Sequence, residues 1–266
     1  MPIGAFTEYV NVAQLVLYAF WVFFAGLIIY LRREDKREGY PLESDRSIRA
    51  PRVKVIGWPA PPPPKTYLLP NGQGTRTAPP PPKPLMDVIP GTRSASPAPG
   101  SPLVPTGNPM LDGVGPASYP PRDDVPDLTF KGTPKIVPMR IALDYYVETA
   151  DPDPRGMNVV ASDGKVVGKV ADLWVDRAEH RILFFEVALD SGADATLPNP
   201  LLPYAFANVK FGRGELRVVS LTTEQFQSVP RTASMDQVTR LEEDRITAYY
   251  GSGRLYGKPN RQEPLI

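Results

Sequence analysis

The stretch VAQLVLYAFWVFFAGLIIYL, residues 12–31, decides the architecture of this chain. It carries no charged side chain, and Gln14 is its one strongly polar residue. An α-helix rises about 1.5 Å per residue, so about 20 apolar residues cross the roughly 30 Å hydrocarbon core of a bilayer. No second run of this kind follows in the sequence. The sequence therefore predicts one transmembrane helix over 12–31, which anchors nearly all of the protein's mass on one side of a membrane.

The charges on either side of this run predict its orientation. Residues 1–11 contain Glu8 and no Lys or Arg, whereas residues 32–38 read RREDKRE. The positive-inside rule counts Lys and Arg near a span and gives acidic residues little weight. We therefore expect residues 1–11 on the periplasmic side and the remaining bulk on the cytoplasmic side. A cleaved signal peptide is the alternative, but the segment lacks a basic n-region, the run is too long, and no small-residue cleavage site follows.

Basic side chains cluster just beyond the end of the predicted span. At headgroup depth, each cation gains about 1 kcal/mol beside anionic lipid. We expect lipid-headgroup contacts from Arg32, Arg33, Lys36 and Arg37.

Composition narrows the classes of function. The 30 basic and 29 acidic residues nearly cancel, so no whole-chain field favours nucleic acid. The absence of Cys excludes disulfides, thiolate metal sites, Fe–S clusters and a Cys nucleophile, and it fits a reducing cytoplasmic face. Any Ser–His–Asp triad would need the single histidine, His180, and the chain has no G-x-S-x-G, Walker A or G-x-G-x-x-G motif. Catalysis by a familiar motif is therefore not expected.

Proline is concentrated in the middle of the chain. Of the 34 prolines, 22 fall between Pro51 and Pro126, with dense runs at 59–64 and 79–84. Proline donates no backbone hydrogen bond and disfavours helix in the residue before it. We therefore predict an extended connecting segment of polyproline II and turns over residues 32–134.

Three interpretations of this proline-rich segment remain open. It is a disordered linker, a PxxP ligand for aromatic-grooved domains, or an extended segment laid over a partner's surface. We favour the third, because a free linker usually carries fewer apolar and aromatic side chains. These side chains are Val53, Val55, Ile56, Trp58, Tyr67, Leu68, Leu69, Met86, Val88 and Ile89.

From about residue 158 the sequence takes on the pattern of β-strands. Short apolar and β-branched runs alternate with turn signals such as Ser162-Asp163-Gly164 and Gly212-Arg213-Gly214. Short strands joined by tight turns are typical of a small antiparallel barrel or sandwich. The predicted strands cover residues 158–161, 165–176, 181–189, 207–211 and 215–221, with turns at 177–180 and 190–192, while strand boundaries within 193–207 stay open.

Helical signals follow the strands. Residues 222–225, TTEQ, predict the start of a short helical turn. Ser234 and Gln237 have capping-box spacing, which predicts the start of a second helix, and Gly251-Ser252-Gly253 is expected to end it. We therefore predict a mainly-β domain over residues 135–266 with a short C-terminal helix.

Five motifs in order carry a resemblance to a known family. They are REGYPLE at 37–43, KTYLLPNGQGT at 65–75, PTGNPMLDGVGPASY at 105–119, VGKVADLWVD at 167–176 and LEEDRITAYYGSGRLY at 241–256. Over nearly its whole length the chain resembles the H subunit of the photosynthetic reaction centre of purple bacteria. The third motif is the most specific, and the fourth is similar to the core of a PRC-barrel.

The resemblance implies an accessory subunit and not an enzyme. The H subunit itself binds no pigment or metal. It caps the cytoplasmic face of the L and M subunits, which hold bacteriochlorophyll, bacteriopheophytin, quinones, non-haem iron and carotenoid. It stabilises the complex in the bacterial photosynthetic membrane and helps protons reach the secondary quinone. A cytochrome subunit, the core light-harvesting antenna and membrane lipids are further partners that the resemblance allows, whereas nucleic acid is not.

The resemblance also implies candidates for proton transfer. Useful relays have pKa values near the working pH, and clustered carboxylates acquire them through repulsion and desolvation. Asp176 and Glu179 correspond to acids of the family's proton-delivery region, and Glu179 is the preferred residue. Glu243, in the acidic run 242–244, and Lys135 match positions near the same path. An acidic pair in a turn that is merely solvated is the alternative.

One departure from the family concerns the entry of protons. Some members carry paired histidines and an acid just before the position of Lys135, whereas residues 127–134 here read DLTFKGTP. Either the entry point differs, or Asp127 and His180 take that role. For His180, an ordinary exposed turn residue is the alternative.

Two other classes of function are weighed against the subunit. A membrane-anchored scaffold would recruit partners through an exposed, mobile segment over 59–84. A membrane-tethered barrel with enzymatic activity would need a catalytic constellation that the sequence lacks.

Overall fold

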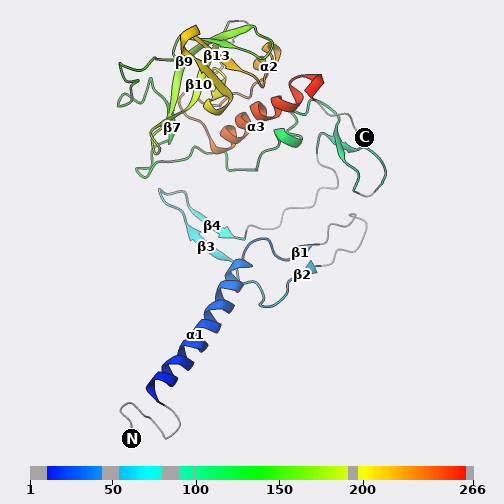
Figure 1. Cartoon of the computed structure of the whole chain (residues 1–266), viewed down its shortest axis with the longest axis vertical. Coiled ribbons are helices and arrows are strands. Elements are labelled where there is room, and N and C mark those ends of the chain that lie inside the picture. Colours follow the sequence, from blue (N-terminus) through cyan, green and yellow to red (C-terminus); the bar gives the residue numbers. More distant parts are fainter. Residues whose placement is uncertain (1–10, 44–53, 80–89, 99, 191–196, 262–266) are drawn as a thin grey trace. The chain divides into compact units, whose positions relative to one another are not determined.

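The computed structural model describes residues 11–43, 54–79, 90–98, 100–190 and 197–261. The chain divides into two compact units, residues 1–87 and 88–266 (Figure 1). Several predicted features lie outside the described residues. They are the periplasmic end at 1–10, most of the second proline run, the apolar positions Val53, Met86, Val88 and Ile89, and residues 191–192 of a predicted turn.

Helix α1, Val12–Asp35, is the long apolar element of the first unit. It begins with a capping box, in which the N–H of Gln14 donates to Asn11 Oδ1 (2.8 Å) and the N–H of Asn11 donates to Gln14 Oε1 (3.2 Å). The one strongly polar residue of the apolar run therefore satisfies the helix start. None of the helix residues is buried, and the length and mean hydropathy of 2.3 suffice to cross a membrane.

Short antiparallel pairs follow α1 in the first unit. β1, Leu42–Glu43, pairs with β2, Lys54–Val55, and β3, Lys65–Leu68, pairs with β4, Thr75–Ala78. β3 and β4 contain no proline, so both can donate to a ladder. Asn71, at φ 56°, lies in the turn between them. The described part of the proline-rich segment is thus more regular than the predicted polyproline II and turns.

The second unit is built around one seven-stranded sheet. Its strand order is β11-β10-β9-β8-β13-β12, and β7 pairs with β9 outside this path. β8 and β13 are parallel, and the other pairs are antiparallel. The sheet is not closed, since no pairing between β11 and β12 occurs among the described residues. The strands are β7 (Ile136–Pro138), β8 (Asn158–Val160), β9 (Val166–Asp176), β10 (Arg181–Leu189), β11 (Leu201–Pro203), β12 (Ala207–Lys210) and β13 (Glu215–Val218), and the separate pair β5 (Thr92–Ser94) and β6 (Leu103–Pro105) precedes them.

The predicted strands all occur in this sheet. β8, β9, β10, β12 and β13 fall within the expected ranges, and the mainly-β fold is confirmed. β7 and β11 were not predicted. Each has only three residues and ends in proline, so neither is long enough to show a period of two.

The core of the second unit joins buried side chains of the sheet, including those of β9, β10 and β11, with side chains of the C-terminal helix. At Gly168, an added Cβ would collide with the backbone carbonyl of Ala188 on the neighbouring strand. Only glycine therefore allows the two strands to approach so closely there. The largest fully buried side chains are Trp174, Tyr250, Phe185, Phe226, Leu173, Leu201, Leu202, Leu216, Leu221 and Ile246.

Helix α2, Thr223–Gln227, confirms the helical turn predicted at 222–225. Thr222 is its N-cap, and Thr222 and Gln225 form a capping box. Ser228 is the C-cap of α2 and lies two residues before Pro230.

The expected bounds of the last helix were wrong. α3 spans Arg240–Tyr256, with Thr239 as its N-cap and Glu242 completing a capping box. Ser234 instead accepts the N–H of Asp236 in a local turn before the helix. Gly251 and Gly253 lie inside α3 and do not end it. Gly253 is needed for close packing, because an added Cβ there would lie 2.6 Å from the carbonyl oxygen of Ser220.

Candidate functional site

The turn between β9 and β10 brings the predicted proton-transfer residues together. Lys135 immediately precedes β7, whose Ile136 lies opposite Asp176 in the β7–β9 register. Lys135 Nζ lies 3.1 Å from Asp176 Oδ2, 3.8 Å from Glu179 Oε1 and 4.0 Å from Asp127 Oδ2. One ammonium group thus contacts three carboxylates from two parts of the sequence, Asp127 in the segment before β7 and the pair Asp176 and Glu179 at the β9–β10 turn. We call these four residues the Lys135 cluster.

Asp176 is the buried member of the Lys135 cluster, with 1% of its surface exposed. Its Oδ1 accepts the backbone N–H groups of Ala178 (2.8 Å) and Glu179 (3.0 Å), so this carboxylate shapes the turn that carries Glu179. Its Oδ2 faces Lys135. Asp176 therefore connects the β9–β10 turn to Lys135, the residue before β7.

Lys135 is held positively charged by its neighbours. Partial burial opposes the charge, but the hydrogen bond and charge of Asp176, with the charges of Asp127 and Glu179, raise the pKa of Lys135 above its ordinary value. The cluster therefore keeps a fixed cation at neutral pH beside its three carboxylates.

The outer side of the cluster is open to solvent. Glu179 is half-exposed and also pairs with Arg181 Nη2 at 2.8 Å. His180 has φ 53°, a left-handed conformation that few non-glycine residues adopt, and its Nδ1 lies 2.6 Å from the hydroxyl of Tyr145. The two rings stack with centroids 5.8 Å apart. His180 is therefore an exposed turn residue that a specific partner orients.

Tyr145 is a member of this region that the sequence did not reveal. Burial and the charge of Asp144 raise the pKa of its hydroxyl, Arg177 opposes the shift, and Asp176 adds to it. The run LDYYVE offers no periodic signal that distinguishes one tyrosine from the other.

Glu243 connects α3 to the same electrostatic environment. Burial and the charge of Asp244 raise its pKa; Lys135 and Arg122 oppose this, and Asp127 adds to it. A carboxyl group with a raised pKa suits proton exchange better than a fully ionised one. The residue also lines a pocket of about 570 Å³ together with Arg181, Phe184, Pro203, Tyr204, Phe206 and Thr247.

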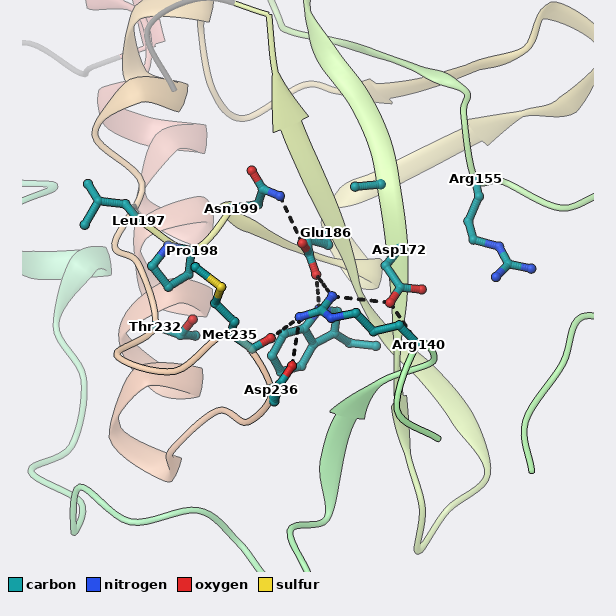
Figure 2. A pocket seen from close by; sticks show the side chains of 12 residues that line it. Arg140, Arg155, Asp172, Glu186, Leu197, Pro198, Asn199, Thr232, Met235 and Asp236 are labelled. Carbon is teal, nitrogen blue, oxygen red and sulfur yellow. Dashed lines mark hydrogen bonds and ion pairs between the residues drawn. The ribbon is translucent and has the colours of Figure 1, made fainter. Parts of the chain in front are cut away.

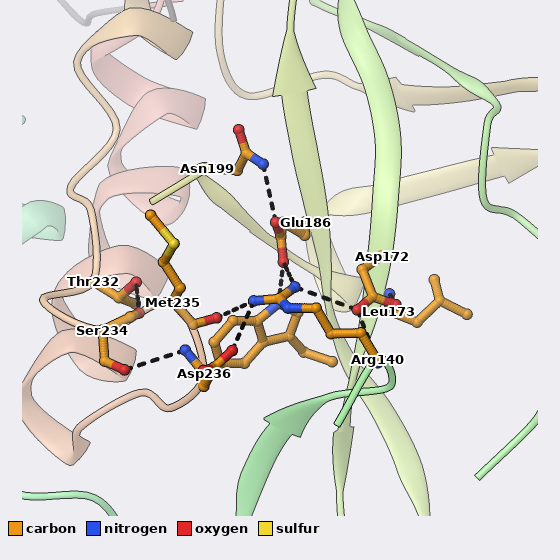
Figure 3. Close-up of polar contacts among 10 residues, drawn as sticks. Arg140, Asp172, Leu173, Glu186, Asn199, Thr232, Ser234, Met235 and Asp236 are labelled. Atoms are coloured by element: carbon orange, nitrogen blue, oxygen red, sulfur yellow. Dashed lines mark hydrogen bonds and ion pairs between the residues drawn. The ribbon is translucent and has the colours of Figure 1, made fainter. Parts of the chain in front are cut away.

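A second polar site, which the sequence analysis did not predict, is centred on Arg140 (Figure 2). Arg140 Nη1 lies 2.6 Å from Glu186 Oε2 and 3.3 Å from Asp172 Oδ2, while Nη2 pairs with Asp236 Oδ1 at 3.2 Å and donates to the carbonyl of Met235. Figure 3 shows these contacts meeting at one guanidinium group. The residues of this site line a pocket of about 790 Å³.

Both acids of this site also accept hydrogen bonds from groups other than the Arg140 guanidinium, and for Asp172 these are the backbone N–H groups of Arg140 and Leu173. Trp174 Nε1 donates to Glu186 Oε2 and Asn199 Nδ2 donates to Glu186 Oε1, both at 2.9 Å. Asp172 and Glu186 lie directly opposite each other in the β9–β10 register, where like charges repel. Burial opposes the charge of Arg140, but its hydrogen bond to Glu186 and the acids around it raise its pKa.

A sequence signal for this second site did exist. Asp172 and Glu186 interrupt the apolar strands VADLWVD and FFEVAL, and a buried acid needs a partner. The sequence could not identify that partner, because Arg140 lies 32 residues before Asp172 and 46 residues before Glu186.

The four basic residues proposed to contact lipid divide into two pairs. Arg32 and Arg33 are exposed on α1. Lys36 and Arg37 are buried, because they donate to backbone carbonyls of the chain's own residues 56–63. Lipid contact stays a prediction. Of the four residues, Arg32 and Arg33 have side chains that are exposed and could contact lipid.

Metal binding has no support in the described residues. No group of three or more His, Asp or Glu side chains in the described ranges is placed to hold a metal ion.

Comparison with known families covers both units of the fold. Residues 4–141 match the family model for the photosynthetic reaction centre, H-chain N-terminal region, which is more than half of the chain. Residues 147–225, which carry the strands from β8 to β13, match the PRC-barrel domain. The resemblance drawn from the five motifs is thereby confirmed. With its apolar helix α1 and its PRC-barrel domain, this chain belongs to the H-chain family of photosynthetic reaction centres.

Proposed function

We propose that this chain covers the L and M subunits of a photosynthetic reaction centre on the cytoplasmic side, stabilises their complex and helps to deliver protons to the secondary quinone. Membership of the H-chain family implies association with L and M in a membrane complex that binds pigments and quinones. The Lys135 cluster is the single observation that carries the proton-delivery role.

The chemistry of quinone reduction explains why such a cluster is useful. Quinone becomes quinol by taking up two electrons and two protons, at a site that must exclude bulk water. Protons then move along ionisable groups or ordered water. The Lys135 cluster combines half-exposed acids, Glu179 and Asp127, with the buried Asp176, so it spans from solvent to the protein interior. Because all three acids surround one ammonium group, we propose that the relay acts as a unit.

Glu243 extends this route to α3. Its pKa is raised mainly by burial, and Lys135 and Asp127 act on it electrostatically. The adjoining pocket of about 570 Å³ is large enough to hold several waters. We propose that protons enter at Asp127 and at His180, which Tyr145 orients, and pass through the cluster to this pocket.

The remaining parts of the complex are assigned to its partners. We propose that L and M hold the bacteriochlorophyll, bacteriopheophytin, quinones, non-haem iron and carotenoid, and that this chain acts without catalytic residues of its own. The basic flank after α1 supports placing the bulk of the chain on the cytoplasmic side. A cytochrome subunit, the core antenna and acidic lipids at Arg32 and Arg33 are proposed as further neighbours.

The test of proton delivery is the variant Glu179→Gln in the intact complex. Flash-induced transfer of the second electron to the quinone is expected to slow several-fold with a changed pH profile, while primary charge separation stays at the parent rate. The matched control is Glu215→Gln, because Glu215 also pairs with an arginine, Arg217, at 2.8 Å but lies outside the Lys135 cluster. Second-electron kinetics that match the control at every pH would remove Glu179 from the route.

A separate experiment tests the assembly itself. Purification from native membranes in mild detergent through a tag after Ile266 is expected to yield bacteriochlorophyll absorption and two larger multi-span subunits. A colourless protein with soluble partners would instead favour the proline-rich scaffold. This readout does not depend on Glu179, so the two parts of the proposal fail independently.

A further inference from the structure

The residues after β2 are fastened to the end of α1. Lys36 Nζ donates to the carbonyls of Ile56 and Pro59, both at 2.9 Å, and Arg37 Nη1 donates to the carbonyl of Pro63 at 2.6 Å. Lys36 is only 3% exposed, so this backbone wraps around its ammonium group. The segment 54–63, its paired strand β1 and the helix end therefore form one local structure, which we call the collar.

The collar lies at a definite depth relative to the predicted span. Lys36 follows Leu31 by five residues, which places it about 7.5 Å beyond the end of the apolar run. The headgroup region on each side of a bilayer is about 5–8 Å thick. The carbonyls of Ile56 and Pro59 bracket Trp58, so a membrane crossed by residues 12–31 would have the backbone of Trp58 at the level of its headgroups.

The collar presents apolar side chains that the chain itself does not cover. Trp58 is 77% exposed. Val55 and Ile56 are about half exposed, as is Leu42, which lies opposite Val55 in the β1–β2 register. Trp is enriched at the membrane–water interface, where its apolar ring meets the acyl boundary and its N–H stays hydrated.

We propose that the collar is a membrane-interface anchor, in which Trp58, Ile56, Val55 and Leu42 insert at the boundary between headgroups and acyl chains. The occupant is the same bilayer that α1 crosses, since the collar is continuous with the span. This proposal assigns Val55, Ile56 and Trp58 to lipid and leaves the partner's surface to the later part of the proline-rich segment. Lys36 is compensated by the chain's own carbonyls, so the anchor works through apolar contact and not through a phosphate. The proposal rests on α1 crossing the membrane and is independent of proton delivery.

Depth-dependent quenching of tryptophan emission tests the anchor. The chain has three tryptophans, Trp21 in α1, the buried Trp174, and Trp58. The full chain and its Trp58→Phe variant are reconstituted in phospholipid vesicles, and the difference between their spectra isolates the emission of Trp58. Lipids brominated near the carbonyl end of the acyl chain are expected to quench this difference more than lipids brominated deep in the chain, with little quenching by aqueous iodide.

Two references make the result decisive. Trp58→Phe combined with Phe130→Trp moves an exposed tryptophan to a site that is 99% exposed in the second unit, and its emission is expected to be quenched by iodide. The emission that remains in Trp58→Phe must be quenched by deeply brominated lipid through Trp21, which checks that α1 spans the bilayer. Iodide quenching of Trp58 equal to that of the Phe130→Trp variant, or protection from both quenchers, would overturn the anchor.

Discussion

Lys135 Nζ lies 3.1 Å from Asp176 Oδ2, although the two residues are 41 positions apart in the sequence. The contact exists because β7 pairs with the last residues of β9, so the residue before β7 meets the residue that closes β9. The cation thereby joins the entry segment around Asp127 to the turn that carries Glu179. The same cation acts on Glu243 of α3, so one ammonium group links acids from three parts of the fold.

The first prediction concerns the pH dependence of stability at Glu243. Its pKa in the folded chain is raised above the ordinary value of 4.5, mainly by burial. The folded state therefore binds more protons than the unfolded state between these two values, and stability falls as pH rises through that window. Glu243→Gln removes this cost. At pH 7 the variant is expected to be more stable than the parent, and the difference should vanish as pH falls toward 4.5.

Urea unfolding of the full chain in mild detergent, followed by circular dichroism at several pH values, measures this effect. The control is Glu148→Gln, which removes an exposed carboxylate from a loop. A stability difference for Glu243→Gln that has the same size at pH 4.5 and pH 7 would contradict the expected linkage.

The second prediction concerns Arg140. Replacing it in Arg140→Met leaves the buried acids Asp172 and Glu186 opposite each other without their cation. Breaking a fully buried ion pair costs about 3–5 kcal/mol, and because the Arg140 side chain is 38% exposed we expect a loss of about 2–4 kcal/mol. Urea unfolding at neutral pH measures this loss.

Arg155 supplies the matched control, because it lines the same pocket but pairs with the half-exposed Asp153 (Figure 2). Arg155→Met is expected to cost less than about 1 kcal/mol. Adding Glu186→Gln to Arg140→Met should recover part of the lost stability, since one of the two facing charges is then removed. Equal losses for Arg140→Met and Arg155→Met would show that the guanidinium does not hold the acids together.

The extent to which the sequence predicted this structure depends on the length of the local signal. The apolar run 12–31 and the strands β9 and β10 are long enough for composition and turn residues to define them. β7 and β11 are too short for a period, and yet β7 positions Lys135. The predicted site residues came from family resemblance. The resemblance indicated which sequence positions belong to the site, but it could not predict the distances between their side chains.

Contacts between distant residues account for most of what could not be predicted. Nothing local indicates that Lys36 would be buried by residues 56–59, so it was assigned to lipid together with its exposed neighbours. Similarly, Tyr145 meets His180 only because of the way the chain returns to the β9–β10 turn. Such pairings depend on tertiary packing, which secondary-structure propensity and hydrophobic periodicity do not predict.

The third prediction uses the two glycines of α3 that were expected to end the helix. An added Cβ at Gly253 would lie 2.6 Å from both the carbonyl oxygen of Ser220 and Cδ2 of Leu221, whereas at Gly251 the nearest atom is Phe206 Cζ at 3.7 Å. Alanine favours a helix interior by about 1 kcal/mol over glycine. Gly251→Ala is therefore expected to stabilise the chain by up to about 1 kcal/mol. Gly253→Ala should destabilise it by about 1–3 kcal/mol, because the backbone contact cannot yield without moving the helix.

The two variants serve as controls for each other, since they make the same chemical change two residues apart in one helix. Urea unfolding followed by circular dichroism gives both values under one condition. Opposite signs would establish that Gly253 is required by the approach of α3 to the end of β13. If both substitutions stabilised the chain, the glycines would act only through helix propensity, and the close contact with Ser220 would have no energetic role.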